Sequence, residues 1–354
     1  MPWGGGGAHK GKNFNFEFLI SVENLLAAWQ EFIRGKRGRQ DVQEFQLHLM
    51  DNILSLHHEL ANKTYTHGGY QHFRISDPKP RDIHKATVRD RLVHHAIYRV
   101  LYPYFSKRFI ADSYSCQLGK GTHKALDRFR SFAGKVSQNN TRTCWVLKCD
   151  IRKFFANIDH GILLAILYSS KVHPDTLWLL ENVVNSFVIA STRSNPGIET
   201  SLDCFAFARN DRRKGLPLGN LTSQLLVNIY MNEFDQFVKH VLKIKFYIRY
   251  ADDFVLLSED RAQLEELIDP VAQFLRDRLH LDLHPDKLFL KTLASGVDFL
   301  GWVHFPDHCV LRTASKRRML RRLEERPDSA ATKISYRGLL RHGNTKKIAV
   351  LLDS

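Results

Sequence analysis

The chain has 354 residues, of which 44% are hydrophobic and 11% aromatic, and its formal net charge at pH 7 is +15. This length exceeds what one hydrophobic core usually supports, so we expect a globular protein of two or three subdomains, and the excess of basic residues favours a polyanionic partner, most simply nucleic acid. The five cysteines are odd in number and include no C-x-x-C pair, which argues against a disulfide framework and against a zinc site.

The N-terminal sequence MPWGGGGAHKGKNF is rich in glycine and has no apolar core. It predicts a flexible tail over residues 1–20 and not a signal peptide. Apolar residues then recur at helical spacing over residues 21–62, which predicts two helices. No apolar run in the sequence approaches membrane-spanning length, so we expect a cytoplasmic protein that makes no contact with a membrane.

A basic segment comes next. It is strand-like from residue 70, passes through a turn in DPKPRDI at 77–83, and becomes an amphipathic helix that begins near Thr87. Its dense basic residues suit contacts with phosphate, although a solvated charged face has the same pattern. LGKGTHKAL at 118–126 lacks the first glycine of a phosphate-binding loop, so we expect a turn followed by a helix there.

Residues 144–224 contain further elements of a predicted functional site. Residues 144–147 predict a buried strand that meets Asp150, and functional groups tend to lie at strand ends in α/β proteins. A helix is expected beyond Asp159, and residues 190–214 predict an insertion or a long loop. GLPLGNLTSQ at 215–224 then leads through a Gly-Pro turn into a long helix.

FYIRYADDFVLLSED at 246–260 places two apolar runs around a very short polar interruption. This pattern predicts a tight β-hairpin with Ala251, Asp252 and Asp253 at or beside its turn. A solvated turn is one explanation of the adjacent carboxylates, because Asp is common in turns. The alternative is a divalent cation between them, since Mg²⁺ prefers one or two carboxylates together with phosphate oxygens. That alternative requires a third carboxylate on another strand, and Asp150 is positioned to provide it.

The C-terminal part continues with mixed structure. Residues 262–279 predict a helix that is interrupted by, or starts at, Pro270. Residues 281–305 predict a strand, a turn that carries a lysine, and a further hairpin. Residues 313–353 predict a strongly basic helical tail.

The order of these motifs resembles that of the reverse transcriptases, over roughly residues 70–303. DPKPRDI, CDIRKFF, GLPLGNLTSQ, YADD and DFLGW follow one another as in this family, and the pattern is most similar to the group II intron and retroelement enzymes of bacteria. The resemblance implies an α+β right-hand polymerase with fingers, a palm built on an antiparallel sheet, and a helical thumb. It also implies an RNA-directed DNA polymerase whose partners are an RNA template, a DNA or RNA primer and dNTPs.

The same resemblance implies a division of the chain into four parts. We expect a flexible tail over 1–20, N-terminal helices and fingers over 21–145, a palm over 146–303 and a thumb over 304–354. The palm would contain the 190–214 insertion together with interleaved fingers elements.

One departure from the intron enzymes narrows the resemblance. Those enzymes usually carry Gln-Gly followed four residues later by Ser-Pro, whereas this chain has Leu218-Gly219 and then Ser223-Gln224. This is similar to the reverse transcriptases of diversity-generating retroelements, which occur in bacteria, archaea and phages and copy a template repeat into cDNA mutagenised at adenines (mutagenic retrohoming). Members of that family work with a small basic accessory protein and a structured RNA. Retron, intron and phage-defence reverse transcriptases remain alternatives, as does a non-catalytic RNA-binding scaffold.

The resemblance also implies the site residues. Two Mg²⁺ ions, for which Mn²⁺ can substitute, would be bound by Asp150 and Asp252, assisted by Asp253 and the backbone carbonyl of Ile151. Lys287 matches a lysine that donates a proton to pyrophosphate, and a plain surface lysine is the alternative. The expected catalytic residues are therefore Asp150, Asp252, Asp253 and Lys287.

The remaining expected residues bind substrates. Phe155 matches the position whose ring excludes a ribose 2′-hydroxyl, and ordinary core packing is the alternative for it. The expected dNTP-binding residues are Lys79, Arg81, Phe155, Leu218 and Gly219. The expected template and primer contacts are Ser223, Gln224, Phe299, Leu300, Gly301 and Trp302.

Overall fold

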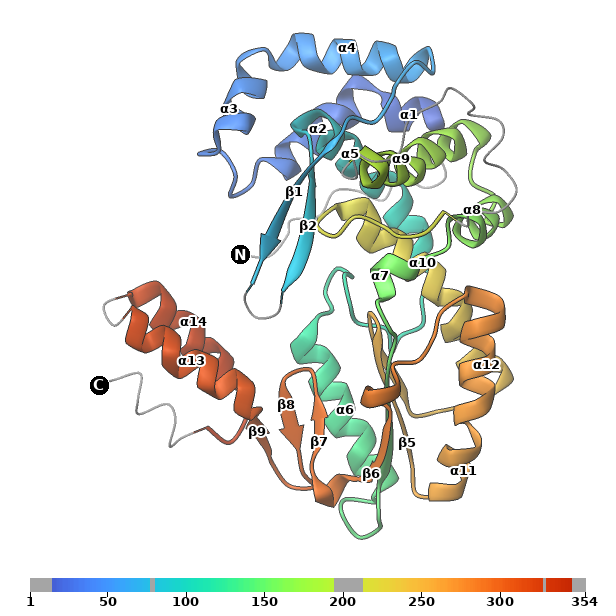
Figure 1. Ribbon diagram of the computed structural model, residues 1–354, viewed down its shortest axis with the longest axis vertical. Helices are drawn as coiled ribbons and strands as arrows, with labels where there is room; N and C mark the ends of the chain where they lie inside the picture. Colours follow the sequence, from blue (N-terminus) through green and yellow to red (C-terminus); the bar gives the residue numbers. More distant parts are fainter. Residues whose placement is uncertain (1–14, 77–79, 194–212, 327–328, 346–354) are drawn as a thin grey trace. The chain divides into compact units, whose positions relative to one another are not determined.

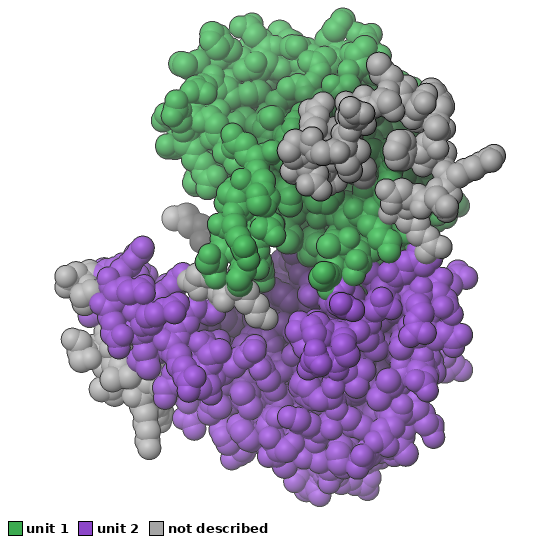
Figure 2. All heavy atoms as spheres, in the orientation of Figure 1, with its two compact units in different colours: residues 1–109, 153–232 green, residues 110–152, 233–354 purple. Residues whose placement is uncertain are grey.

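The computed structural model describes residues 15–76, 80–193, 213–326 and 329–345. These residues form two compact units, coloured separately in Figure 2. Unit 1 is drawn from residues 1–109 and 153–232, and unit 2 from residues 110–152 and 233–354. Each unit therefore combines segments that are distant in the sequence.

Unit 1 begins with a helical layer (Figure 1). Its helices are α1 (Phe16–Ile20), α2 (Val22–Phe32), α3 (Gln40–Leu47), α4 (Leu49–Ala61) and α5 (Val88–Phe105). Ser21 separates the first two because its hydroxyl accepts a hydrogen bond from the amide of Asn24 at the start of α2. Two helices were expected over 21–62 and three are present. Helical structure also begins at Phe16, inside the segment for which a flexible tail was expected.

A β-hairpin follows the helical layer in unit 1. Strand β1 (Tyr70–Ile75) pairs antiparallel with β2 (Arg81–Ala86), and most of the side chains of β1 are exposed. Thr87 then caps α5 by accepting a hydrogen bond from the amide of Asp90, which confirms the predicted helix start. The turn residues 77–79 lie outside the described part of the chain.

The second segment of unit 1 supplies more helices. They are α7 (Phe154–Asn157), α8 (His160–Ser169), α9 (Pro174–Arg193) and α10 (Leu221–Gln236), the last of which ends in unit 2. Asp159 caps α8, as the predicted helix beyond it requires. Helix α9 extends to Arg193, so the expected 190–214 insertion begins within a helix, and residues 194–212 lie outside the described part.

Unit 2 is built on a four-stranded antiparallel sheet of order β4-β5-β3-β6. The strands are β3 (Trp145–Asp150), β4 (Tyr247–Tyr250), β5 (Asp253–Ser258) and β6 (Phe289–Thr292). Helix α6 (Thr122–Val136) covers one face, and α11 (Arg261–Glu266) with α12 (Ile268–Leu279) lies on the other (Figure 1). Because both faces are covered, residues 254–257 are all buried, which explains the unbroken apolar run in the sequence.

The packing of helix α6 differs from the expected division between fingers and palm. Residues 110–145 were assigned to the fingers, but α6 packs its Phe129 and Phe132 into the same core as Val146 and Val255 of the sheet. The hydrophobic contacts of this helix therefore place it with the palm-like sheet of unit 2.

A second sheet and two helices complete unit 2. The sheet has strands β7 (Val297–Phe299), β8 (Trp302–His304) and β9 (Cys309–Leu311), and the helices are α13 (Thr313–Glu325) and α14 (Ala330–Leu340). Strand β9 pairs with β8 and lies inside the segment expected to be thumb, so the expected boundary at residue 304 cuts through this sheet. None of the helices in the described part of the chain has the length and apolar character needed to cross a membrane.

Candidate active site

The carboxylates predicted from the sequence meet at one end of the four-stranded sheet. Asp150, the last residue of β3, is paired in register with Asp253, the first residue of β5. Tyr250 of β4 also pairs with Asp253, so Ala251 and Asp252 form a two-residue turn between the strands. The amide of Ile151 donates to the carbonyl of Asp252 over 3.1 Å, which fixes this turn to the end of β3. The predicted hairpin is confirmed, and β3 brings the third carboxylate beside it.

Two lysines lie against these carboxylates. Lys287 Nζ is 2.8 Å from Asp150 Oδ1, and Lys148 Nζ is 3.3 Å from Asp253 Oδ1. Lys287 ends a 3-10 turn, and that turn is anchored because the amide of His284 donates to the carbonyl of Asp150 over 2.7 Å. The sequence reasoning missed Lys148. Its position two residues before Asp150 on the same strand, hence on the same face, was the available signal.

The environment of Asp253 disfavours its negative charge. Burial raises the pKa of its carboxyl to about 6, Lys148 opposes the increase, and the negative charges of Asp150 and Asp252 add to it. Its Oδ1 atom is buried, and although Lys148 is close, the geometry there is not that of a hydrogen bond. The protein alone therefore stabilises the ionised form of Asp253 poorly.

These residues fit a divalent cation. Carboxylate and carbonyl oxygens are the ligands that Mg²⁺ prefers, and a cation would satisfy the buried Oδ1 of Asp253. In the described part of the chain, no three His, Cys, Asp or Glu side chains already stand in a metal-binding cluster. The side chains of Lys287 and Lys148 lie beside Asp150 and Asp253, respectively.

Unit 1 gathers several of the residues expected to bind dNTP. The amide of His84 on β2 donates to the carbonyl of Leu218 over 3.1 Å, so the Leu218-Gly219 segment lies along the strand that begins with Arg81. Gly219 has φ 109°, and a Cβ there would lie 3.2 Å from Ile83 Cγ2, so a close approach to β2 favours glycine. Lys79 lies outside the described residues.

Phe155 is tied to the same segment of unit 1. It lies in the short helix α7, is half-buried, and its carbonyl accepts a hydrogen bond from the amide of Leu216 over 2.8 Å. The ring of Phe154 packs edge-on against it, with 5.5 Å between centroids. Phe155 and Leu218 are therefore held by neighbouring parts of one backbone segment.

Several residues expected to touch template or primer are buried. Ser223 on α10 is 2% exposed, Phe299 is fully buried and Trp302 is 2% exposed. Phe299 and Trp302 are a cross-strand pair of the β7-β8 hairpin and belong to the hydrophobic core of unit 2. A direct contact of these three side chains with nucleic acid is therefore not supported.

The turn of the β7-β8 hairpin is more accessible than Phe299 and Trp302 in its strands. Leu300 and Gly301 form this turn, with φ values of 51° and 88°, and both are partly exposed. Positive φ at both central residues is typical of a type I′ hairpin turn. Of the expected FLGW contacts, these two keep accessible surface, as does the partly buried Gln224 on α10.

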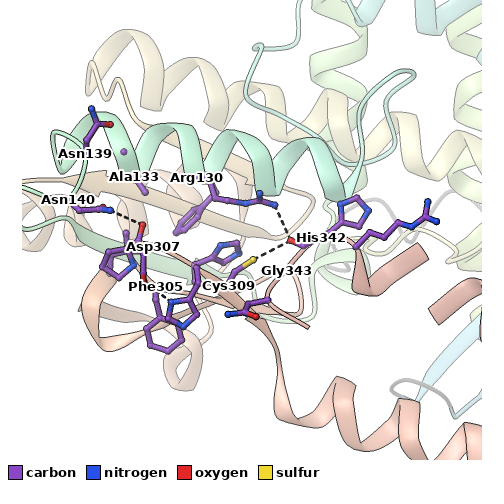
Figure 3. Close-up of a pocket in the computed structure, with 17 residues that line it drawn as sticks. Arg130, Ala133, Asn139, Asn140, Phe305, Asp307, Cys309, His342 and Gly343 are labelled. Carbon is purple, nitrogen blue, oxygen red and sulfur yellow. Dashed lines mark hydrogen bonds and ion pairs between the residues drawn. The ribbon is translucent and has the colours of Figure 1, made fainter. Parts of the chain in front are cut away.

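Unit 2 also contains a pocket of about 630 Å³, drawn in Figure 3. Arg130 of α6, Cys309 of β9 and His342 are among its lining residues. The carbonyl of His342 accepts hydrogen bonds from Arg130 Nη2 over 3.3 Å and from Cys309 Sγ over 3.4 Å. None of the residues that line this pocket belongs to the carboxylate end of the four-stranded sheet.

Comparison with known proteins identifies the family of this arrangement. The family model described as "Reverse transcriptase (RNA-dependent DNA polymerase)" matches residues 76–304, which is more than half of the chain. Protein YkfC of Escherichia coli (strain K12) is 25% identical over 287 residues, which cover 72% of this chain and 69% of YkfC. The group II intron-encoded protein LtrA of Lactococcus lactis is 27% identical over 288 residues, covering 63% of this chain and 44% of LtrA.

The family match confirms the expected α+β right-hand polymerase fold, with which the antiparallel sheets and mixed helices agree. Among solved structures, the apo telomerase from Candida tropicalis, truncated from its C-terminal domain, matches with a TM-score of 0.49 and 10% identity. That match covers 70% of this chain and 55% of the telomerase chain. The chain thus spans only part of the length of LtrA and of the telomerase.

The raised pKa of Asp253 predicts how stability depends on pH. The folded protein keeps a proton on Asp253 up to about pH 6, whereas the unfolded chain releases it near 3.8. Between these values the folded state binds more protons, so the contribution of Asp253 to the free energy of unfolding falls as pH rises. We expect Asp253→Asn to remove this loss and to stabilise the metal-free protein at pH 7.5 by on the order of 1–3 kcal/mol relative to wild type.

Urea unfolding in EDTA at pH 4 and pH 7.5 measures this difference. The exposed Asp277→Asn removes the same charge without the burial and serves as the matched control. A gain for Asp253→Asn that is the same at both pH values would contradict the assignment.

Proposed function

The chain belongs to the reverse transcriptase (RNA-dependent DNA polymerase) family, and on this premise we propose that it copies an RNA template into DNA by two-metal nucleotidyl transfer. The observation that carries the proposal is the register of the palm-like sheet. It pairs Asp150 with Asp253 and places Asp252 in the adjoining turn. A polymerase needs carboxylates at such a point because its catalysis consists mainly of positioning and charge neutralisation.

The residues of unit 2 have distinct roles in this proposal. Asp150 and Asp252 would hold two Mg²⁺ ions, or Mn²⁺ in their place, with Asp253 and the carbonyl of Ile151 assisting. When bound, such ions activate the primer 3′-hydroxyl and neutralise the leaving pyrophosphate. Lys287 Nζ lies 2.8 Å from Asp150 Oδ1, and Lys287 would donate a proton to the pyrophosphate.

The residues of unit 1 would bind the nucleotide. Arg81 begins β2 with its side chain exposed, and the planar fork of a guanidinium suits the oxygens of a triphosphate. Lys79 would assist it. Phe155 would place its half-buried ring against the sugar, and Leu218 with Gly219 would line the base, supported by their backbone contact with β2.

The template and primer partners would be held mainly through their phosphates. Helix α13 contains a dense basic sequence, SKRRMLRR at 315–322, and only Met319 of this helix is buried. Contacts of this kind give affinity that falls with salt and depends little on base sequence. Gln224 and the Leu300-Gly301 turn would add contacts near the growing end. We place this activity in the cytoplasm of a bacterium, an archaeon or a phage-infected cell.

The finer proposal is that the enzyme serves a diversity-generating retroelement. Its support is the sequence at Leu218-Gly219 and Ser223-Gln224, which differs from the Gln-Gly and Ser-Pro usual in intron enzymes. In this role it would act with a small basic accessory protein and would make adenine-mutagenised cDNA. An intron, retron or phage-defence enzyme is the alternative, and the likeness to the intron-encoded LtrA is consistent with it. A non-catalytic RNA-binding scaffold would lack DNA synthesis altogether.

Replacement of Asp252 tests the polymerase activity itself. Asp252→Asn removes a negative metal ligand and leaves the basic surface intact, so we expect DNA synthesis to fall by at least about 100-fold while affinity for RNA stays within about twofold. Primer extension on an RNA template, together with filter binding, measures both quantities. Asp277→Asn on the exposed face of α12 is the control with the same change of charge. Robust extension by Asp252→Asn in Mg²⁺ would refute the assignment.

Shortening of Phe155 tests the recognition of the sugar. If the ring blocks a 2′-hydroxyl, Phe155→Val should raise the ratio of ribonucleotide to deoxynucleotide incorporation, because a steric barrier is removed. Single-nucleotide insertion kinetics with both substrates measure the ratio. Phe154 is the buried neighbour of Phe155. Phe154→Val should lower both activities by destabilising the fold and should leave the ratio unchanged. Equal loss of both activities in Phe155→Val would identify Phe155 as a packing residue.

Replacing Leu218 with glutamine, the residue usual at this position in intron enzymes, tests the role of Leu218 in mutagenesis. Leu218 provides shape but no hydrogen bond, whereas an amide there would add about 0.5–1.5 kcal/mol of discrimination. We therefore expect Leu218→Gln to lower misincorporation opposite template adenine by up to about tenfold. Sequencing of cDNA made at matched turnover measures the error at each template base. Leu218→Met keeps the apolar character and should retain the parent error rate, and an unchanged rate in an active Leu218→Gln enzyme would contradict the hypothesis.

A further inference from the structure

A buried ion pair lies directly behind the turn that carries Asp252. Arg249 on β4 is 1% exposed and Asp235 at the end of α10 is fully buried. Arg249 Nη2 is 2.7 Å from Asp235 Oδ2, and Arg249 Nε is 2.8 Å from Asp235 Oδ1. The pair is therefore bidentate and rigid.

The pair is completed by two hydroxyl groups. The hydroxyl of Tyr247 donates to Asp235 Oδ1 over 2.8 Å, and Arg249 Nη2 also donates to Ser113 Oγ over 3.0 Å. A buried ion pair costs much desolvation free energy and is a poor source of net stability. The role of this ion pair therefore lies in the groups that the guanidinium holds in place.

The guanidinium holds the catalytic turn. Arg249 Nη1 donates to the carbonyl of Ala251 over 3.1 Å. Ala251 has φ 56°, in the left-handed region that is sterically unfavourable for a residue other than glycine. The hydrogen bond from Arg249 to this carbonyl favours the observed turn conformation, in which Ala251 has positive φ immediately before Asp252.

The backbone of Arg249 is itself anchored on the side away from β5. Its amide donates to the carbonyl of Asp112 over 3.0 Å, and its carbonyl accepts from the amide of Tyr114 over 3.0 Å. Asp112 is fixed in turn by Arg128 at 2.7 Å and by Lys239 at 3.2 Å. The guanidinium thus reaches the turn from a strand that is held on both edges.

We infer that Arg249 is a positioning residue that acts through the Ala251 carbonyl to hold Asp252 in its metal-binding orientation. Asp235, Tyr247 and Ser113 serve to orient its guanidinium. The inference rests on the proposed polymerase function, in which Asp252 is a metal ligand. It assigns to this buried network a role in metal affinity that is separate from folding.

Arg249→Lys tests the inference because it keeps one positive charge for Asp235 but has no second nitrogen for Ala251. We expect the Mg²⁺ concentration for half-maximal primer extension to rise about tenfold, and RNA affinity to stay unchanged. The increase in Tm that Mn²⁺ induces in the protein without nucleic acid should shift to correspondingly higher Mn²⁺ concentrations. Arg142→Lys, in the exposed Arg142–Glu259 ion pair of unit 2, should leave both metal responses at their wild-type values.

Ala251→Gly provides a second test, because glycine adopts positive φ without the steric cost. In the Arg249→Lys background it should recover at least threefold of the lost metal response, whereas beside the intact Arg249 the turn is already formed and the gain should be smaller. A purely structural role for Arg249 would lower Tm without moving either metal response. It would also make the effect of Ala251→Gly the same in both backgrounds, and either result would overturn the inference.

The Tm response to Mn²⁺ requires no DNA synthesis. If the wild-type protein extends no primer, the proposed function fails, and the Mn²⁺ response of the variants still decides the role of Arg249. If the wild type extends primers and Arg249→Lys has an unchanged metal response, only the inference about Arg249 fails.

Discussion

The repulsion between the carboxylates at one end of the unit 2 sheet is the constraint to which the surrounding residues respond. The register of β3 and β5 sets Asp150 against Asp253, and the turn adds Asp252. The cost is visible in the pKa of Asp253, which burial and the neighbouring charges raise to about 6. Lys148 and Lys287 reduce the repulsion from within the protein. A site of this kind is stabilised further by any divalent cation that binds it, which links the instability of the metal-free state to the proposed chemistry.

The rest of unit 2 makes this arrangement rigid. Helix α6 and its phenylalanines fill one face of the sheet, and Phe254 on the other face packs 5.1 Å from the ring of Phe234. With both faces buried, a slip of β5 by one residue would exchange the residues of its two faces and would separate Asp253 from Asp150. The Arg249–Asp235 pair adds a side-chain contact to the turn, because Arg249 Nη1 donates to the carbonyl of Ala251, whose φ is 56°.

In unit 1, backbone hydrogen bonds hold together segments that are distant in the sequence. The Leu218-Gly219 segment is bonded along β2, and Leu216 is bonded to Phe155. Three sequence motifs that are far apart in the chain, around Arg81, Phe155 and Leu218, are thereby held in one backbone assembly. This gives a physical basis for treating them as parts of one proposed nucleotide-binding surface.

Features that depend on neighbouring residues could be predicted from the sequence. The apolar runs around Ala251, Asp252 and Asp253 defined the hairpin, the strand before Asp150 supplied a third carboxylate, and Thr87 marked the start of α5. These signals are local because side-chain periodicity, turn chemistry and helix capping act over a few residues. The order of the motifs was sufficient to indicate the polymerase family.

Which side chains remain accessible, and which charged groups lie close together, depends on the tertiary structure. It buried Ser223, Phe299 and Trp302, which the motif pattern had suggested as nucleic-acid contacts. In the structure, α6 packs against the palm-like sheet and β9 belongs to the second sheet. Lys148 lies beside Asp253, and Arg249 pairs with Asp235. Burial and ion pairing depend on partners that are remote in the chain, so no local pattern specifies them, and they are settled when sheet register and helix packing are fixed together.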